Sequence, residues 1–126
     1  MPFFTASSSP HGTAFVVQAR GELDYQHAPV FRSEMTKAWE SGVSSVVVID
    51  VTELTFCDST GVGELILSLQ RSQALGTRLT LVGVHGTLER ILAITGLRPA
   101  FELSPPSRRL CGAPDRPAVR SDRPQP

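Results

Sequence analysis

Three stretches of the chain space their apolar residues at intervals of three and four, as one face of a helix requires. The first covers residues 28–40, the second ends at Gly76, and the third runs from a capping Thr87 to Gly96. Their apolar stripes are Phe31, Met35, Ala38 and Trp39; Val62, Leu65, Ile66 and Leu69; and Leu88, Ile91, Leu92 and Thr95. Glycine suits the residue that follows a helix, because it adopts the left-handed conformation there at little cost. The pattern therefore predicts three amphipathic helices.

Short runs rich in β-branched residues lie between and beyond these stretches. They predict strands over residues 14–20, 46–49, 78–84 and 101–103. The run Val46–Ile49 shows no polar alternation, which is typical of a strand buried on both faces, as in a parallel sheet covered by helices. Residues 21–24 predict a turn away from the first strand, and residues 51–56 predict an irregular connection. Strands that alternate with helices indicate an α/β domain with right-handed crossovers.

The composition changes abruptly at residue 104. Residues 104–126 contain six prolines and five arginines and carry a net charge of +3, so residues 1–103 carry −3 in a chain of zero net charge. Few apolar residues follow residue 104, and such a segment cannot offset the entropy lost on ordering by itself. We therefore predict one domain over residues 1–103, in which residues 1–13 are poorly specified, and a disordered Pro/Arg-rich tail over residues 104–126.

Composition excludes several classes of protein. With 126 residues, 40% of them hydrophobic, the chain is long enough for one buried core. A mildly acidic domain is a poor match for nucleic-acid phosphates, which need clustered positive charge. The N-terminus lacks a signal-peptide pattern, and no apolar stretch approaches the roughly 18–20 residues of a membrane span. These features predict a cytoplasmic protein in which Cys57 and Cys111 are free thiols.

The stretch Asp58-Ser59-Thr60-Gly61 directly precedes the second predicted helix. First-turn amides have no partner within the helix, and the macrodipole is positive there. Phosphorylation of a hydroxyl at this position would add about two negative charges at a helix end suited to hold them. The surface would become anionic while the fold survived, and a partner docked there would meet an uncompensated charge. As an isolated motif, however, the same stretch is more often a plain capping sequence.

Two other kinds of site are weaker candidates. A hydrolase could be assembled from Ser59, His85 and either Asp24 or Asp50, but Ser59 is not in a G-x-S-x-G elbow. Capping is the simpler interpretation for Asp24 and Asp50, because carboxylates often cap or turn the chain at strand ends. The three histidines have no metal-ligand spacing, so no metal site is expected.

Four sequence blocks occur in a consistent order between residues 14 and 103. They are Gly21–Asp24 (GELD), Val46–Asp50 (VVVID), Leu54–Gly63 (LTFCDSTGVG) and Ile91–Leu97 (ILAITGL). Together they resemble the STAS family, in particular the anti-sigma factor antagonists. The resemblance implies a small mixed sheet of about four to five strands with helices packed on it.

The resemblance also implies a role. Unphosphorylated antagonists of this family bind an anti-sigma factor and so free a sigma factor for transcription. That anti-sigma factor is typically an ATP-dependent serine kinase, which phosphorylates the serine after the motif Asp and ends the interaction. The serine is Ser59 here, with Thr60 as the alternative, and a serine phosphatase resets the switch. Asp24 and Asp58 match family residues that shape the partner surface, to which Ser59, Thr60 and Gly61 also belong.

On this interpretation the chain is a kinase substrate and not an enzyme. It needs no cofactor of its own, because ATP is used by the partner kinase. Its partners are then an anti-sigma factor and a phosphatase, and neither nucleic acid nor a membrane. The alternative is a constitutive STAS interaction module in a transport or signalling complex, which has the same fold without phosphorylation at Ser59.

Overall fold

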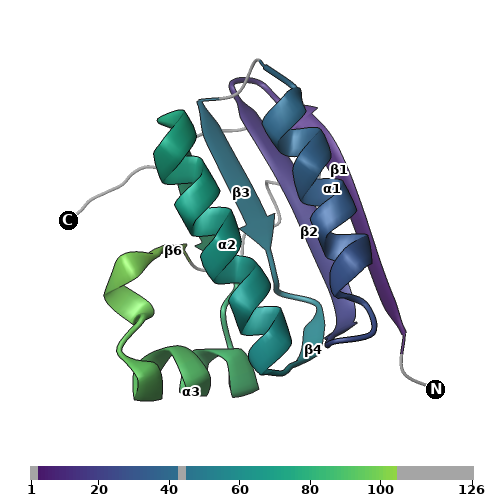
Figure 1. The fold of residues 1–126 in the computed structure, drawn as a ribbon, viewed down its shortest axis with the longest axis vertical. Coiled ribbons are helices and arrows are strands. Elements are labelled where there is room, and N and C mark those ends of the chain that lie inside the picture. Colours follow the sequence, from purple (N-terminus) through teal and green to yellow (C-terminus); the bar gives the residue numbers. More distant parts are fainter. Residues whose placement is uncertain (1–2, 43–44, 105–126) are drawn as a thin grey trace.

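The strands form one mixed sheet. The structure is a computed structural model that describes residues 3–42 and 45–104, and in this part of the chain the strand order is β1-β2-β3-β5-β6, with β4 paired beside β2 (Figure 1). The bounds are β1 (Phe4–His11), β2 (Ala14–Leu23), β3 (Val46–Asp50), β4 (Leu54–Cys57), β5 (Arg78–Val82) and β6 (Glu102–Ser104). The pairing of β1 with β2 is antiparallel, and every other pairing is parallel. The predicted α/β class with a mixed sheet is confirmed.

The three predicted helices are present. They are α1 (Ala28–Glu40), α2 (Ser59–Leu75) and α3 (Gly86–Thr95), and a short 3-10 helix, η1 (Arg98–Ala100), follows. Helices α1 and α2 lie side by side on one face of the sheet, while α3 lies near one end of α2 (Figure 1). None of the helices in the described part of the chain is long and apolar enough to cross a membrane.

The core lies between the sheet and these helices. Val47 and Ile49 of β3 pack in one cluster with Phe31 of α1 and Leu65 of α2. Val48 points to the opposite face, where it forms a second, smaller apolar cluster with residues of β2 and β5. Residues 47–50 of β3 are all buried, so the prediction of a strand buried on both faces is confirmed. In the described part of the chain, α1 and α2 lie on the face of Val47 and Ile49.

The predicted turn at residues 21–24 is also wrong, because β2 continues to Leu23. Gly21 has a φ of +96°, and the register between β2 and β4 shifts between Gly21 and Glu22. The hydroxyl of Thr55 donates to the carbonyl oxygen of Gly21 at 3.1 Å, which holds β4 against this irregularity. A glycine that bends a strand locally has the same sequence signature as a glycine that ends one.

Two strands were not predicted. β1 lies in the poorly specified residues 1–13, where three consecutive serines, residues 7–9, lie in a largely exposed strand and leave no apolar pattern. β4 lies in the segment 51–56 predicted to be an irregular connection, and it has only four residues. Both strands are held mainly by backbone pairing with β2. Backbone hydrogen bonds between distant segments leave no periodic side-chain signal.

Small differences occur at the element ends. α3 begins at Gly86 with His85 as its N-cap, so Thr87 is not the cap. β5 ends at Val82, and β6 reaches Ser104, one residue past the predicted end of the domain. The remaining residues of the predicted tail, 105–126, lie outside the described part of the chain, as does Cys111.

Candidate functional site

Asp58 fixes the start of α2. Its backbone is extended, with φ −93° and ψ −172°, and its side-chain Oδ1 accepts a hydrogen bond from the amide of Gly61 at 2.9 Å. The sequence predicted a capping stretch at residues 58–61, and in the structure the cap is the carboxylate of Asp58, which satisfies one of the unpaired first-turn amides. The carboxylate is thereby held in one orientation beside the two hydroxyl residues that follow it.

Ser59 and Thr60 occupy the first turn of α2 and differ in accessibility. Ser59 is exposed, and within the described part of the chain its hydroxyl makes no hydrogen bond. Thr60 is half-buried. An exposed hydroxyl is accessible to an incoming phosphoryl donor, whereas a half-buried hydroxyl is partly shielded by its neighbours. The geometry therefore favours Ser59 over Thr60.

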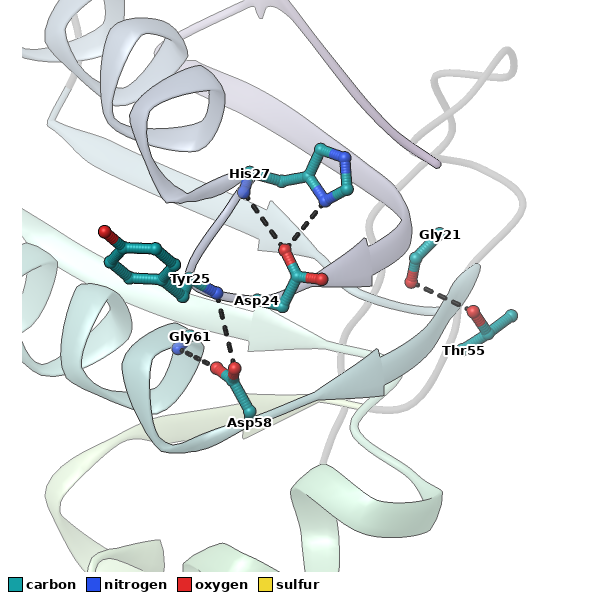
Figure 2. A network of polar contacts seen from close by, with 7 residues as sticks. All are labelled: Gly21, Asp24, Tyr25, His27, Thr55, Asp58 and Gly61. Atoms are coloured by element: carbon teal, nitrogen blue, oxygen red, sulfur yellow. Dashed lines mark hydrogen bonds and ion pairs between the residues drawn. The ribbon is translucent and has the colours of Figure 1, made fainter. Parts of the chain in front are cut away.

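The loop after β2 meets the start of α2. The amide of Tyr25 donates to Oδ2 of Asp58 at 3.3 Å (Figure 2). The amide of Asp58 donates to the carbonyl oxygen of Leu23, also at 3.3 Å. Asp58 thus contacts α2 through one carboxylate oxygen and the loop of Asp24 through the other. The GELD block and the DSTG block, 33 residues apart between Tyr25 and Asp58, form one surface.

The carboxylate of Asp24 is held by His27. Oδ1 of Asp24 accepts from the backbone amide of His27 at 3.0 Å and lies 2.8 Å from the imidazole Nδ1 (Figure 2). Burial alone would raise the pKa of Asp24, but the amide and imidazole of His27 outweigh it, so the pKa is lowered overall. Asp24 therefore stays ionised near neutral pH, and the site carries two carboxylates, those of Asp24 and Asp58.

Two exposed aromatic residues flank the site and were not singled out from the sequence. Tyr25 is 80% exposed and Phe56 is 42% exposed. Tyr25 directly follows Asp24, and Phe56 lies two residues before Asp58. Exposed aromatic residues beside fixed polar groups are typical of protein interfaces. In the sequence they look like core residues, and only their exposure in the fold distinguishes them.

A Ser-His-Asp arrangement is not formed by the residues predicted for it. Nε2 of His85 lies 2.9 Å from the carbonyl oxygen of Thr52, and Oδ1 of Asp50 accepts from the amide of Thr52 at 3.0 Å. Asp24 is engaged with His27, and nothing in the described part of the chain hydrogen-bonds to the Ser59 hydroxyl. Residues 3–42 and 45–104 also contain no cluster of three or more metal-ligating side chains.

Removing the Asp58 cap gives a testable loss of stability. We expect Asp58→Ala to lower the free energy of unfolding by about 1 kcal/mol, because the Gly61 amide then loses its acceptor. Asp58→Asn should lose less, since its amide oxygen still accepts from Gly61. Urea denaturation of both variants measures the difference. Equal losses would mean that the charge of Asp58, and not its capping bond, stabilises the helix start.

Cys57 is expected to be unreactive in the folded protein. Burial, and secondarily the charge of Asp58, raises the pKa of its thiol to about 12. At pH 8 the thiolate, which is the reactive form, is therefore scarce. In a Cys111→Ser variant, where Cys57 is the only thiol, we expect alkylation to be roughly 100-fold or more slower in buffer than in denaturant. Similar rates would show that the β4–α2 junction opens readily.

Comparisons with known proteins agree with this arrangement. A family model described as the STAS domain matches residues 7–108. The chain is 31% identical over 83 residues to the anti-sigma-B factor antagonist of Listeria monocytogenes, a match that covers 66% of this chain and 72% of that protein. An anti-sigma factor antagonist structure from Mycobacterium paratuberculosis has a TM-score of 0.71 at 24% identity, over 81% of this chain and 86% of that one. The antagonist SpoIIAA in its unphosphorylated form has a TM-score of 0.70 at 20% identity, over 85% and 92%. These two structures are similar in fold.

Proposed function

This chain belongs to the STAS domain family, and we propose that it is an anti-sigma factor antagonist whose binding is switched off by phosphorylation of Ser59. The family resemblance drawn from the four sequence blocks is confirmed by the match over residues 7–108. The role as an antagonist is supported by the name of the Listeria relative, which is 31% identical. The position of the switch is supported by the geometry at the start of α2.

The observation that carries the proposal is the exposed hydroxyl of Ser59, which makes no hydrogen bond within residues 3–42 and 45–104, beside a fixed carboxylate. Ser59 is the first residue of α2, and Asp58 is held by hydrogen bonds from Gly61 and Tyr25. A phosphate on Ser59 adds about two negative charges next to Asp58, whose carboxylate the loop after Asp24 contacts through the amide of Tyr25. Like charges placed together at a docking surface repel an acidic partner and must be desolvated before any partner can bind. Binding is lost, while the buried contacts of α2 are untouched.

The partner class follows from the same chemistry. The proposed partner is an anti-sigma factor that is also a serine kinase, because the surface it binds then contains the hydroxyl it modifies. It uses ATP, and this chain needs no cofactor. A serine phosphatase restores the hydroxyl. In this cycle the chain is a substrate and not a catalyst, and it acts in the cytoplasm, where the transcription machinery lies.

Phosphate mapping tests the proposal. The full chain is incubated with ATP and each candidate anti-sigma kinase of its own genome, and the products are mapped by mass spectrometry and passed over the kinase. We expect phosphate on Ser59, absent from Ser59→Ala, and loss of the complex on phosphorylation. Phosphate on Thr60 alone would keep the mechanism and move its site by one residue.

The competing function predicts a different result. A constitutive interaction module would bind its partner stably and take up no phosphate with any kinase. That outcome would overturn the switch while leaving the fold and the family assignment intact.

A further inference from the structure

The imidazole of His27 contacts both the start of β1 and the carboxylate of Asp24. Its Nδ1 lies 2.8 Å from Oδ1 of Asp24, and the backbone amide of His27 donates to the same oxygen at 3.0 Å (Figure 2). The ring also packs against the ring of Phe4, with the centroids 6.1 Å apart and the planes tilted by 33°. The imidazole is therefore held by an aromatic contact as well as by hydrogen bonds.

Phe4 gives the imidazole a fixed support. Its side chain is only 8% exposed, and in the pairing of β1 with β2 it lies opposite Gly21 of the GELD block. The carbonyl oxygen of Phe3, the residue before it, accepts from the amide of Glu22 at 2.8 Å. The start of β1 is thus fastened to the block that carries Asp24, and the imidazole packs on a side chain that is fixed relative to that carboxylate.

The contact with Asp24 determines which ring nitrogen carries the hydrogen. An ionised carboxylate can only accept hydrogen bonds, so Nδ1 of His27 is the donor. Both bonds from His27 end on Oδ1, while the side chain of Asp24 remains 21% exposed. The other oxygen, Oδ2, is therefore the one that a partner can approach, and the bonds to Oδ1 set its position.

The needs of α1 do not explain a histidine at this position. His27 is the N-cap residue of α1, where Ser, Thr, Asp and Asn are preferred because their side chains accept from first-turn amides. The side chain of His27 makes no such capping bond. What the imidazole supplies instead is a donor toward Asp24 and a ring that packs on Phe4.

We propose that His27 is a positioning residue for partner binding, which holds the carboxylate of Asp24 in the orientation that a cationic side chain of the anti-sigma factor binds. The inference rests on the proposed function, because the loop after Asp24 contacts Asp58, the residue before Ser59. A carboxylate that is not held samples several rotamers and loses that freedom on binding, whereas one already held loses little. An arginine or lysine of the partner then meets Oδ2 in one place.

Two substitutions separate hydrogen-bond donation from packing. His27→Asn keeps an N–H donor near the position of Nδ1 but loses the ring, whereas His27→Leu keeps an apolar side chain against Phe4 but loses the donor. In titration calorimetry of the full chain with the kinase that modifies Ser59, we expect His27→Leu to weaken binding about 10-fold and His27→Asn about 2-fold or less. The opposite order would assign the effect to packing on Phe4 and overturn the proposal.

A second measurement reports on Asp24 without any partner. The carboxyl carbon of Asp24 is followed by NMR during an acid titration of each variant. The pKa of Asp24, which burial raises and His27 lowers, should rise in His27→Leu because the ionised form loses a donor, and it should stay low in His27→Asn. An unchanged pKa of Asp24 in His27→Leu would show that the imidazole does not hold the carboxylate and would overturn the proposal.

The same experiments separate this inference from the proposed function. The unmodified chain could bind the kinase and lose that binding on phosphorylation of Ser59, while both His27 variants bind as tightly as the unmodified chain. In that case the switch stands and the positioning role of His27 is overturned. Absence of binding by the unmodified chain to any kinase would overturn the proposed function, and the docking role of His27 with it.

Discussion

Replacing Gly61 with alanine is expected to lower the free energy of unfolding by about 3 kcal/mol. A Cβ at this position would lie 2.5 Å from the carbonyl oxygen of Leu23 and 2.7 Å from Sγ of Cys57. The first of these atoms is backbone within β2, so it cannot move aside as a flexible side chain would. The start of α2 would have to shift away from the sheet, and with it the Asp58 cap and the hydroxyl of Ser59.

Gly63 provides a matched control two residues further along the same helix. A Cβ at Gly63 meets no atom within 4 Å. Alanine is favoured over glycine inside a helix by about 0.5–1 kcal/mol, so Gly63→Ala should raise the free energy of unfolding. Urea denaturation measures both variants. If the two substitutions changed stability in the same direction, close packing of α2 on β2 would not be what requires glycine at position 61.

The second large effect is on binding. Replacing Ser59 with aspartate is expected to weaken binding to the kinase that modifies Ser59 by about 100-fold, or roughly 3 kcal/mol. The added carboxylate directly follows Asp58, which the loop after Asp24 contacts, and it must be desolvated at the interface. The free energy of unfolding should change by less than about 0.5 kcal/mol, because Ser59 is exposed and an acidic residue suits a helix N-terminus. Titration calorimetry and urea denaturation separate the two quantities.

Two variants serve as controls for this substitution. Ser59→Ala removes the phosphorylated hydroxyl without adding charge, so it should bind about as tightly as the unmodified protein. Ser9→Asp adds the same charge to an exposed position of β1 that pairs with Val16, several residues from the Leu23 end of β2. It should leave binding unchanged. Equal weakening by Ser9→Asp and Ser59→Asp would indicate a general charge effect and contradict a switch at Ser59.

Much of the molecule was predictable from local sequence pattern. The apolar stripes placed α1, α2 and α3, because each stripe reports which face of one helix is buried. Asp58 and Gly61 were recognisable as a helix start, since capping depends on residues three apart in the chain. The position of Ser59 in the first turn of α2 follows from the same local information.

Other features depended on tertiary structure. The strands β1 and β4, the bend of β2 at Gly21 and the bond from Tyr25 to Asp58 all join segments that are distant in the sequence. Such contacts are made largely by backbone groups, which every residue carries, so no residue type marks them. The sequence by itself therefore determined the three helices, the position of Ser59 at the start of α2 and the family. Only the tertiary structure decided which sheet face the helices cover and that the loop after Asp24 contacts Asp58, the residue before Ser59, because backbone pairing brings these segments together.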